Sequence, residues 1–265
     1  MKSGLAGFLC FIVLCITLSL GLWPFHAPRN DVTWLNDGSG LAFGKQGTVM
    51  SLGVLKVASS QERESGSIEI WVRPKSWQSS AALLTLYSPE LGFQFALRQS
   101  LSDLEVSTES RSLLGQELKN HFYVDDALGS ALRQKKLVFI SVTFGQQGTS
   151  VFLNGVRARM ASHFRVGAGT FTGRVILGDS PRQPDSFRGE IRGLAIYESE
   201  LDSARILRHY KTWTANGQPD ISQDERNIAL YLFDEHTGDV IRSHAETADC
   251  DLYIPKNYGE LPGRS

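Results

Sequence analysis

Residues 66–74 read Gly-Ser-Ile-Glu-Ile-Trp-Val-Arg-Pro, and this stretch decides the fold class of the chain. Between Ser67 and Arg73, isoleucine and valine alternate strictly with glutamate, tryptophan and arginine. A period of two is typical of a β-strand that buries one face. Pro74 ends the strand, because proline has no backbone N–H to donate to a sheet. The stretch therefore predicts a strand with one face in a hydrophobic core.

Short strands of the same kind are predicted along the rest of the chain. They cover residues 82–87, 92–97, 103–108, 137–144, 149–153, 156–160, 174–177, 189–197 and 228–233. Asn154-Gly155 is a strong hairpin signal, because both residues tolerate positive φ. One helix is expected at 201–210, where Asp202 can cap it and apolar residues recur at helical spacing. Residues 109–134 are the least patterned, and predict a loop or a short helix near 126–133. Many short strands and one helix together predict an all-β antiparallel sandwich.

The N-terminus carries a run of 19 residues without a charge, LAGFLCFIVLCITLSLGLW at 5–23. As a helix it would rise about 28 Å, close to the roughly 30 Å hydrocarbon core of a bilayer. A retained anchor is favoured over a cleaved signal peptide, whose apolar core is shorter. Lys2 is the only charged side chain before the run, so the positive-inside rule places residues 24–265 outside the cytoplasm. Residues 1–26 are therefore expected to be a single transmembrane helix or a signal segment.

Composition excludes several classes of partner and fold. The net charge is −1 and the isoelectric point is near 6.6, and no basic cluster is visible, so no nucleic acid partner is expected. Cys250 is the only cysteine outside the apolar run, so a disulfide within the folded domain is impossible. The remaining 240 or so residues suffice for one sandwich with a sizeable core.

Four phrases resemble the laminin G-like domains of the concanavalin A-like lectin/glucanase superfamily, and they occur in the order of that family. The phrases are LAFGKQGTVMSL at 41–52, GSIEIWVRP at 66–74, FLNGV at 152–156, and VILGDS at 175–180 followed by FRGEIRGLAIYESELDSARI at 187–206. The resemblance implies a concanavalin A-like jelly-roll β-sandwich over residues 27–246, with 247–265 as a C-terminal tail. The arrangement is also similar to bacterial ectodomains found beside VanZ-like membrane proteins, which implies a location at the bacterial cytoplasmic membrane.

A fifth phrase stands out of order. Residues 229–246, ALYLFDEHTGDVIRSHAE, resemble the strand that usually begins such a domain, but in this chain they come after the other four phrases. They could begin a truncated second copy, or they could supply the missing first strand from the C-terminal side. The second explanation is favoured, because domain termini often lie close together and few residues remain.

Acidic residues and asparagine are the candidates for catalysis and for metal binding in this chain. The glucanases of the superfamily carry E-x-D-x-E or a near variant on one strand, and we identified no such phrase; Glu69 and Glu190 each stand alone and are expected to face solvent. The family resemblance implies a calcium ion at the rim of the sandwich. The candidate ligands are Asp179, Asp185, Asn36 and Asp37.

Sugar binding requires exposed aromatic rings, and the candidates are Trp77, Trp34 and Trp213. The predicted function is a membrane-anchored, extracytoplasmic recognition module that binds glycan or another envelope component without catalysis. An alternative is a structural or protein-interaction module that assists a VanZ-like membrane protein. A glycan hydrolase is a third possibility, and it would need two carboxyl groups roughly 5–9.5 Å apart in a groove.

Overall fold

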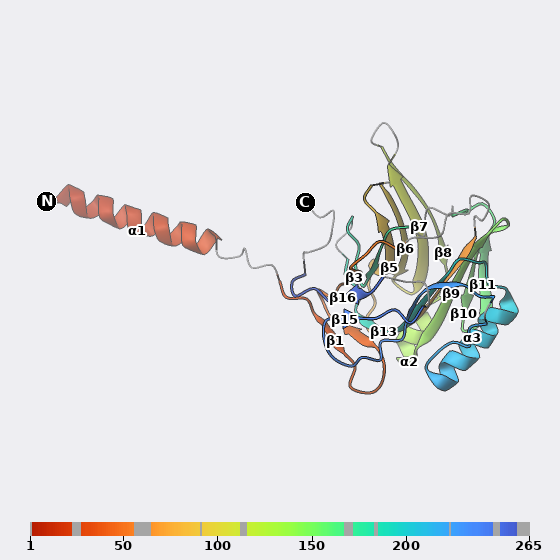
Figure 1. Ribbon diagram of the computed structural model, residues 1–265. Helices are drawn as coiled ribbons and strands as arrows, with labels where there is room; N and C mark the ends of the chain where they lie inside the picture. Colours follow the sequence, from red (N-terminus) through yellow and green to blue (C-terminus); the bar gives the residue numbers. More distant parts are fainter. Residues whose placement is uncertain are drawn as a thin grey trace.

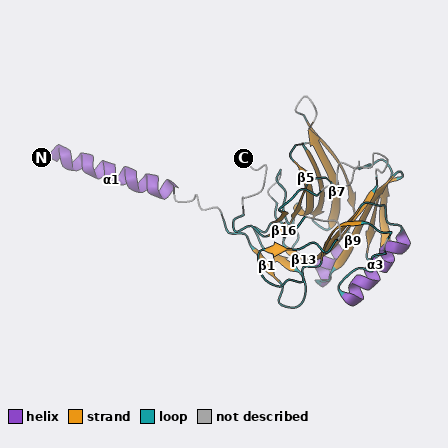
Figure 2. Ribbon diagram, in the orientation of Figure 1, coloured by secondary structure: helices purple, strands orange, loops and turns teal. Residues whose placement is uncertain are grey.

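In the residues that it describes, the computed structural model has two eight-stranded antiparallel sheets and three helices (Figures 1 and 2). It describes residues 2–22, 28–55, 65–90, 92–111, 116–166, 172–182, 185–222, 224–245 and 250–258. The all-β sandwich predicted from the strand pattern is confirmed, and its two packed antiparallel sheets fit a jelly roll.

The first sheet is built around β4 (Gly66–Pro74), the strand with the alternating pattern. Its order is β1 (Val32–Trp34), β2 (Leu41–Phe43), β13 (Gly189–Tyr197), β4 (Gly66–Pro74), β9 (Val138–Gly145), β10 (Gly148–Leu153) and β11 (Val156–Ala161), and β14 (Asn227–Tyr231) also pairs with β13. β2 pairs with the first half of β13 and β14 with its second half. The two therefore lie end to end along one side of the same strand.

The second sheet includes the last strands of the described chain. Its order is β15 (Val240–Ile241), β16 (Leu252–Tyr253), β3 (Val49–Ser51), β12 (Arg174–Leu177), β5 (Ala81–Ser88), β6 (Phe93–Ser100), β7 (Asp103–Arg111) and β8 (Glu117–Val124). β8 falls in the stretch for which no strand was predicted, because its mostly exposed residues show no apolar alternation. Helix α2 (Gly129–Gln134) follows β8, close to the short helix predicted near 126–133.

The core lies between the facing sheets. Ile68, Ile70 and Val72 of β4 are fully buried there, as the alternation predicts. Phe95 of β6 and Phe144 of β9 meet across the sheets at 5.3 Å between ring centroids, nearly edge to face. The sandwich therefore rests on apolar packing, and no disulfide is needed.

The C-terminal segment completes both sheets. β14 adds to the first sheet, and β16 pairs with β3 in the second. Tyr231 and Phe233 are fully buried in the core. This placement is the one expected if 229–246 completes the sandwich. The second sheet also includes residues beyond 246. Leu252 and Tyr253, which were predicted to belong to a C-terminal tail, form β16.

Helix α3 (Ser203–Asn216) covers the outer face of the first sheet (Figure 2). Asp202 caps it as predicted, accepting hydrogen bonds from the backbone N–H groups of Ala204 and Arg205. Near the end of the helix, the Trp213 ring packs edge-on against Trp71 of β4. Gly193 of β13 lies directly beneath Trp213, where any larger side chain would collide with the indole.

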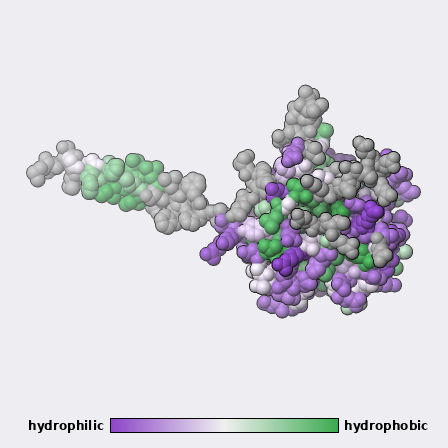
Figure 3. All heavy atoms as spheres, in the orientation of Figure 1, coloured by the Kyte–Doolittle hydropathy of each residue, from purple (hydrophilic) through white to green (hydrophobic). Residues whose placement is uncertain are grey.

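Helix α1 (Lys2–Leu22) occupies the predicted N-terminal anchor and lies apart from the sandwich (Figure 1). Within this helix, residues 7–18 are exposed, and Figure 3 shows an apolar band there. Among the residues that the structure describes, no helix is both long enough and apolar enough to cross a membrane. The structure therefore does not confirm the predicted transmembrane helix.

Candidate functional site

The three tryptophans singled out from the sequence lie in three different environments. Trp77 is 54% exposed in the loop between β4 and β5. Trp34 is half-buried, and its indole N–H donates to the Gly238 carbonyl at 2.9 Å. Trp213 is only 1% exposed, so its ring faces the sheet and offers no surface to a ligand. Trp77 is therefore the most exposed of the three tryptophans.

The calcium candidates Asp179 and Asp185 follow β12, in the segment that crosses the outer face of the second sheet. Asp185 forms an ion pair with Arg98, whose side chain is fully buried, and accepts a hydrogen bond from Ser80 at 2.7 Å. Burial raises the pKa of Asp185, although Arg98 and Ser80 act against this. Asp179 is fully buried and accepts from the Ser180 backbone N–H. Asp185 therefore already has a protein cation as its partner.

Asn36 and Asp37 lie in the turn between β1 and β2. The Asp37 carboxylate pairs with Arg192 at 3.2 Å, and Arg192 also contacts Glu190 at 3.0 Å. Glu190, expected from the sequence to face solvent, is mostly covered and also pairs with Arg73. Within the described residues, no three His, Cys, Asp or Glu side chains come together as a metal site. Because Asp185 and Asp37 are already paired with arginines, we do not expect calcium to bind at these positions.

Strand β7 carries two carboxylates that were not singled out from the sequence. Glu105, Ser107 and Glu109 alternate with core residues and share the outer face of the second sheet. Lys119 Nζ lies 2.9 Å from Glu105 Oε1 and 3.9 Å from Glu109 Oε1, so these oxygens are within about 7 Å of each other. The spacing Glu-x-Ser-x-Glu was the available signal, and it was missed because the expected phrase has Asp at its centre.

The surroundings of this pair disfavour glycoside hydrolysis. The Lys119 ammonium group occupies the space between the carboxylates, where a scissile bond would have to lie. Arg182 adds a second cation, 3.9 Å from Glu109 Oε2. Both glutamates are less than a tenth exposed. The described arrangement is therefore an ion-pair network without an open gap for substrate.

A second buried network joins α3 to the first sheet. Glu69, expected from the sequence to face solvent, is fully buried, because α3 covers this face of β4. His209 of α3 contacts Glu69 through Nδ1 at 3.0 Å and Glu225 through Nε2 at 3.1 Å. Carboxylates only accept hydrogen bonds, so both ring nitrogens must donate and the imidazole is positively charged. Tyr197 also donates to Glu69, at 2.9 Å.

The pKa values of this network follow from burial and charge together. Burial alone would lower the pKa of His209, but Glu69 and then Glu225 outweigh it, and the pKa is raised. Burial would raise the pKa of Glu225, but the Ser222 N–H and the charge of His209 lower it overall. Burial, followed by the charge of Glu69, raises the pKa of Tyr197 well above its usual range. The network thus favours the doubly protonated, charged form of His209 and ties α3 to the first sheet.

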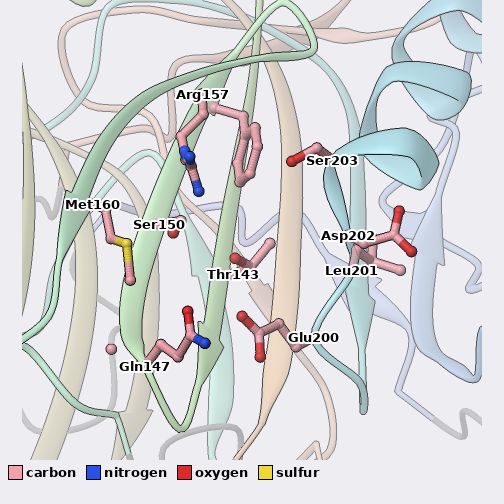
Figure 4. A pocket seen from close by; sticks show the side chains of 11 residues that line it. Thr143, Gln147, Ser150, Arg157, Met160, Glu200, Leu201, Asp202 and Ser203 are labelled. Atoms are coloured by element: carbon pink, nitrogen blue, oxygen red, sulfur yellow. The ribbon is translucent and has the colours of Figure 1, made fainter.

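A surface pocket lies where the start of α3 meets β9, β10 and β11 (Figure 4). It has a volume of about 140 Å³ and is open to solvent. Its lining residues are Thr143, Gln147, Gly148, Ser150, Phe152, Arg157, Met160, Glu200, Leu201, Asp202 and Ser203. Phe152 and Leu201 are buried and form an apolar floor. None of the lining residues was predicted from the sequence to bind a ligand.

The polar side chains of this pocket are arranged around its mouth. Figure 4 shows Gln147, Ser150 and Arg157 on one side and Glu200 on the other. The Glu200 carboxylate lies against Gly145, at a point where any β-carbon would collide with it. Thr143 is 2% exposed, and its side chain is one of those that line the pocket. None of Thr143, Gln147, Ser150, Arg157 and Glu200 forms a hydrogen bond or ion pair through its side chain with another described residue.

Residues 49–207 match the family model of the concanavalin A-like lectin/glucanases superfamily. The chain belongs to this family. The sandwich, with β4 at the centre of its first sheet, is the fold that the family resemblance implied. No curated protein sequence matches this concanavalin A-like chain.

Solved structures with a similar fold include several binding domains. A putative carbohydrate binding protein from Bacteroides ovatus has a TM-score of 0.50 at 12% identity, covering 86% of this chain and 58% of that chain. The receptor binding domain of botulinum neurotoxin C/D mosaic serotype has a TM-score of 0.49 at 13% identity, covering 80% and 59%. The CBM40 domain of Ruminococcus gnavus IT-sialidase, bound to α2,3-sialyllactose, has a TM-score of 0.44 at 18% identity, covering 64% and 95%. At these identities the likeness concerns the fold alone.

Proposed function

We propose that this protein is a non-catalytic glycan-binding module and that the pocket of Figure 4 is its binding site. The observation that carries the proposal is a set of polar side chains that have no partner among the described residues and that lie beside apolar lining residues. Ligand pockets commonly combine an apolar lining with a few convergent polar groups. The family description, which includes lectins, and the fold shared with a putative carbohydrate binding protein support the same class of ligand.

The chemistry of the pocket suits the hydroxyl groups of a sugar. Arg157 and the Gln147 amide can donate hydrogen bonds to hydroxyl oxygens, and Glu200 can accept from hydroxyl protons. Ser150 and Thr143 can do both. The apolar face of a pyranose ring can then pack on Met160, which lines the pocket and is 43% exposed. Because cationic and anionic side chains share the pocket, a neutral sugar fits it better than a strongly charged one.

The test is a glycan array probed with the detergent-solubilised full chain, followed by affinity measurements on any glycan found. Arg157→Met and Glu200→Gln should each weaken binding about 10- to 100-fold, the loss expected for a hydrogen bond to a charged group. Arg159→Met, on the same strand but outside the pocket lining, and Glu117→Gln, on the edge strand β8, are the matched controls. An array without binding, or affinity that survives both pocket substitutions, would contradict the proposal.

Attachment to a membrane is part of the same proposal. Its support is the uncharged run at 5–23 and the exposed apolar side chains of α1, among them Phe8, Phe11 and Leu14. The chain should stay with membranes after extraction with alkaline carbonate, with residues 28–258 on the extracytoplasmic side. Recovery of the protein wholly in the soluble fraction would defeat this part. A VanZ-like partner remains an alternative role, for which a co-purification experiment is the test.

A further inference from the structure

Two exposed apolar side chains stand together at one end of the sandwich. Trp77 is 54% exposed in the loop between β4 and β5, and Leu101 is 55% exposed in the turn between β6 and β7. The Leu101 backbone N–H donates to the Gln78 carbonyl at 2.7 Å, so the loop and the turn are in direct contact. We call Trp77 and Leu101 the apolar tip. Single exposed apolar residues are common on protein surfaces, so the role of the tip has to be argued from its surroundings.

Side-chain hydrogen bonds hold the tip in place. The Gln99 amide donates to the Ser76 and Leu101 carbonyls, both at 2.9 Å. The Gln78 amide donates to the Ser186 carbonyl and accepts from the Arg188 backbone N–H, both at 2.8 Å. The loop and the turn are therefore tied to each other and to the segment before β13, while the two apolar side chains stay outside.

Hydrogen bonds connect the loop of the tip to the segment by which the chain enters the sandwich after α1. The Tyr258 backbone N–H donates to the Pro28 carbonyl at 2.7 Å. The Ser186 hydroxyl donates to the Tyr258 hydroxyl at 2.9 Å, and the Ser186 carbonyl accepts from Gln78, next to Trp77. Pro28, the first described residue after α1, is thus linked to the tip loop through two residues. A membrane that held α1 would lie near this end of the sandwich.

Exposed basic side chains lie on segments that contact the loop and the turn of the tip. Lys75 and Arg188 are exposed and adjacent, since the Lys75 backbone N–H donates to the Arg188 carbonyl. Lys135 and Lys136 are exposed at the end of α2, and the residue before this helix, Leu128, donates to the Ser102 carbonyl of the tip turn. None of these four cations forms an ion pair with another described residue. Three acidic residues lie in the same region. Asp126 is paired with Arg133, and Asp103 accepts a hydrogen bond from the Asp126 backbone N–H. Asp125 is exposed.

We propose that the apolar tip docks on the lipid surface of the membrane to which α1 is attached. Tryptophan favours the interface between headgroups and acyl chains, and lysine and arginine near it attract anionic lipid. This inference rests on the proposed membrane attachment, and it adds that the sandwich contacts the bilayer through a defined end. The glycan pocket, which lies between α3 and β9–β11, is a separate surface.

The test uses the full chain reconstituted in vesicles of phosphatidylcholine and phosphatidylglycerol with brominated acyl chains, which quench nearby tryptophan fluorescence. The difference between wild type and Trp77→Phe isolates the signal of Trp77. This component should be quenched, and Trp34→Phe should leave it unchanged. Leu101→Ser should reduce the quenching of Trp77. Leu118→Ser should not, because Leu118 is equally exposed, at 56%, but lies toward the other end of the β7–β8 pair.

Flotation of the vesicles after a carbonate wash distinguishes attachment of the chain to the membrane from docking of the apolar tip. If the chain floats and Trp77 is not quenched, the attachment stands and the docking of the tip is overturned. If the chain does not float, both fail. Equal effects of Leu101→Ser and Leu118→Ser would also overturn the docking. If Trp77→Phe abolishes glycan binding in detergent while Trp77 shows no quenching, the ring is a sugar-stacking surface and the membrane proposal is wrong.

Discussion

Replacing His209 by glutamine should strongly destabilise the sandwich, because it removes the only cation that contacts Glu69 among the described residues. After the substitution, Glu225 still has Arg208 at 2.6 Å and the Ser222 N–H at 2.7 Å. Glu69 keeps only the hydroxyl groups of Tyr197 at 2.9 Å and Ser141 at 3.5 Å. A buried carboxylate that loses its partner costs about 3–5 kcal/mol. We expect a loss at the lower end of this range, since two hydroxyl groups and the new amide still solvate Glu69.

Urea and thermal unfolding would measure this loss, followed by tryptophan fluorescence, which reports α3 through the buried Trp213. For a domain of this size, about 3 kcal/mol corresponds to a fall of roughly 6–12 °C in the melting temperature. His163→Gln, which changes an exposed histidine, should stay within about 0.5 kcal/mol of wild type. Adding Glu69→Gln to His209→Gln should recover part of the stability, because no buried charge is then left alone.

The same network predicts how stability depends on pH. Since the pKa of His209 is raised in the folded state, its contribution is complete below the unfolded value of about 6.5 and is lost as pH rises through the folded value. Since the pKa of Glu225 is lowered, its contribution is complete above the unfolded value of about 4.3 and is lost as pH falls through the folded value. His209→Gln should abolish the alkaline part of this profile. Additive effects of His209→Gln and Glu69→Gln, or an unchanged alkaline profile, would refute the reasoning.

Three further outcomes can be measured by thermal melting. Gly193→Ala should cost about 1–3 kcal/mol, because the added methyl group collides with Trp213; a neutral effect would mean that α3 packs differently. Deleting residues 227–246 should prevent stable folding, because it removes β14 and β15 with the fully buried Tyr231; an unchanged melting temperature would favour a truncated repeat. Millimolar calcium should leave the melting temperature unchanged, because Asp185 is already paired with Arg98; a clear rise would establish a calcium site.

Local patterns in the sequence predicted most strands, but they did not show what covers each face. The alternation in 67–73 correctly placed Ile68, Ile70 and Val72 in the core, and it put Glu69 on the opposite face. Whether that face meets solvent depends on α3, whose His209 lies 140 positions further along the chain. Strand periodicity distinguishes two faces and says nothing about a helix that later packs on one of them. The expectation that Glu69 faces solvent was wrong for this reason.

The functional site was harder to predict than the fold. The candidate pocket brings together Thr143, Arg157 and Glu200 from three separate elements, and none of them belongs to a short motif. Glu105 and Glu109 did leave a signal in their Glu-x-Ser-x-Glu spacing, but only Glu105 lay on a predicted strand, 103–108. Their ion pairs with Lys119 come from β8, a strand that was not predicted at all.

The all-β class, the family, the hairpin at 154–155 and the capped helix after Asp202 could be predicted from the sequence, because each depends on the spacing or chemistry of neighbouring residues. Three features could be seen only in the folded chain: β14 and β16 complete the two sheets, Glu69 and His209 form a buried ion pair, and hydrogen bonds through Ser186 and Tyr258 link the loop of the apolar tip to Pro28. These features join residues far apart in the chain. They form only when distant surfaces pack together around the core, so the spacing of neighbouring residues does not predict them.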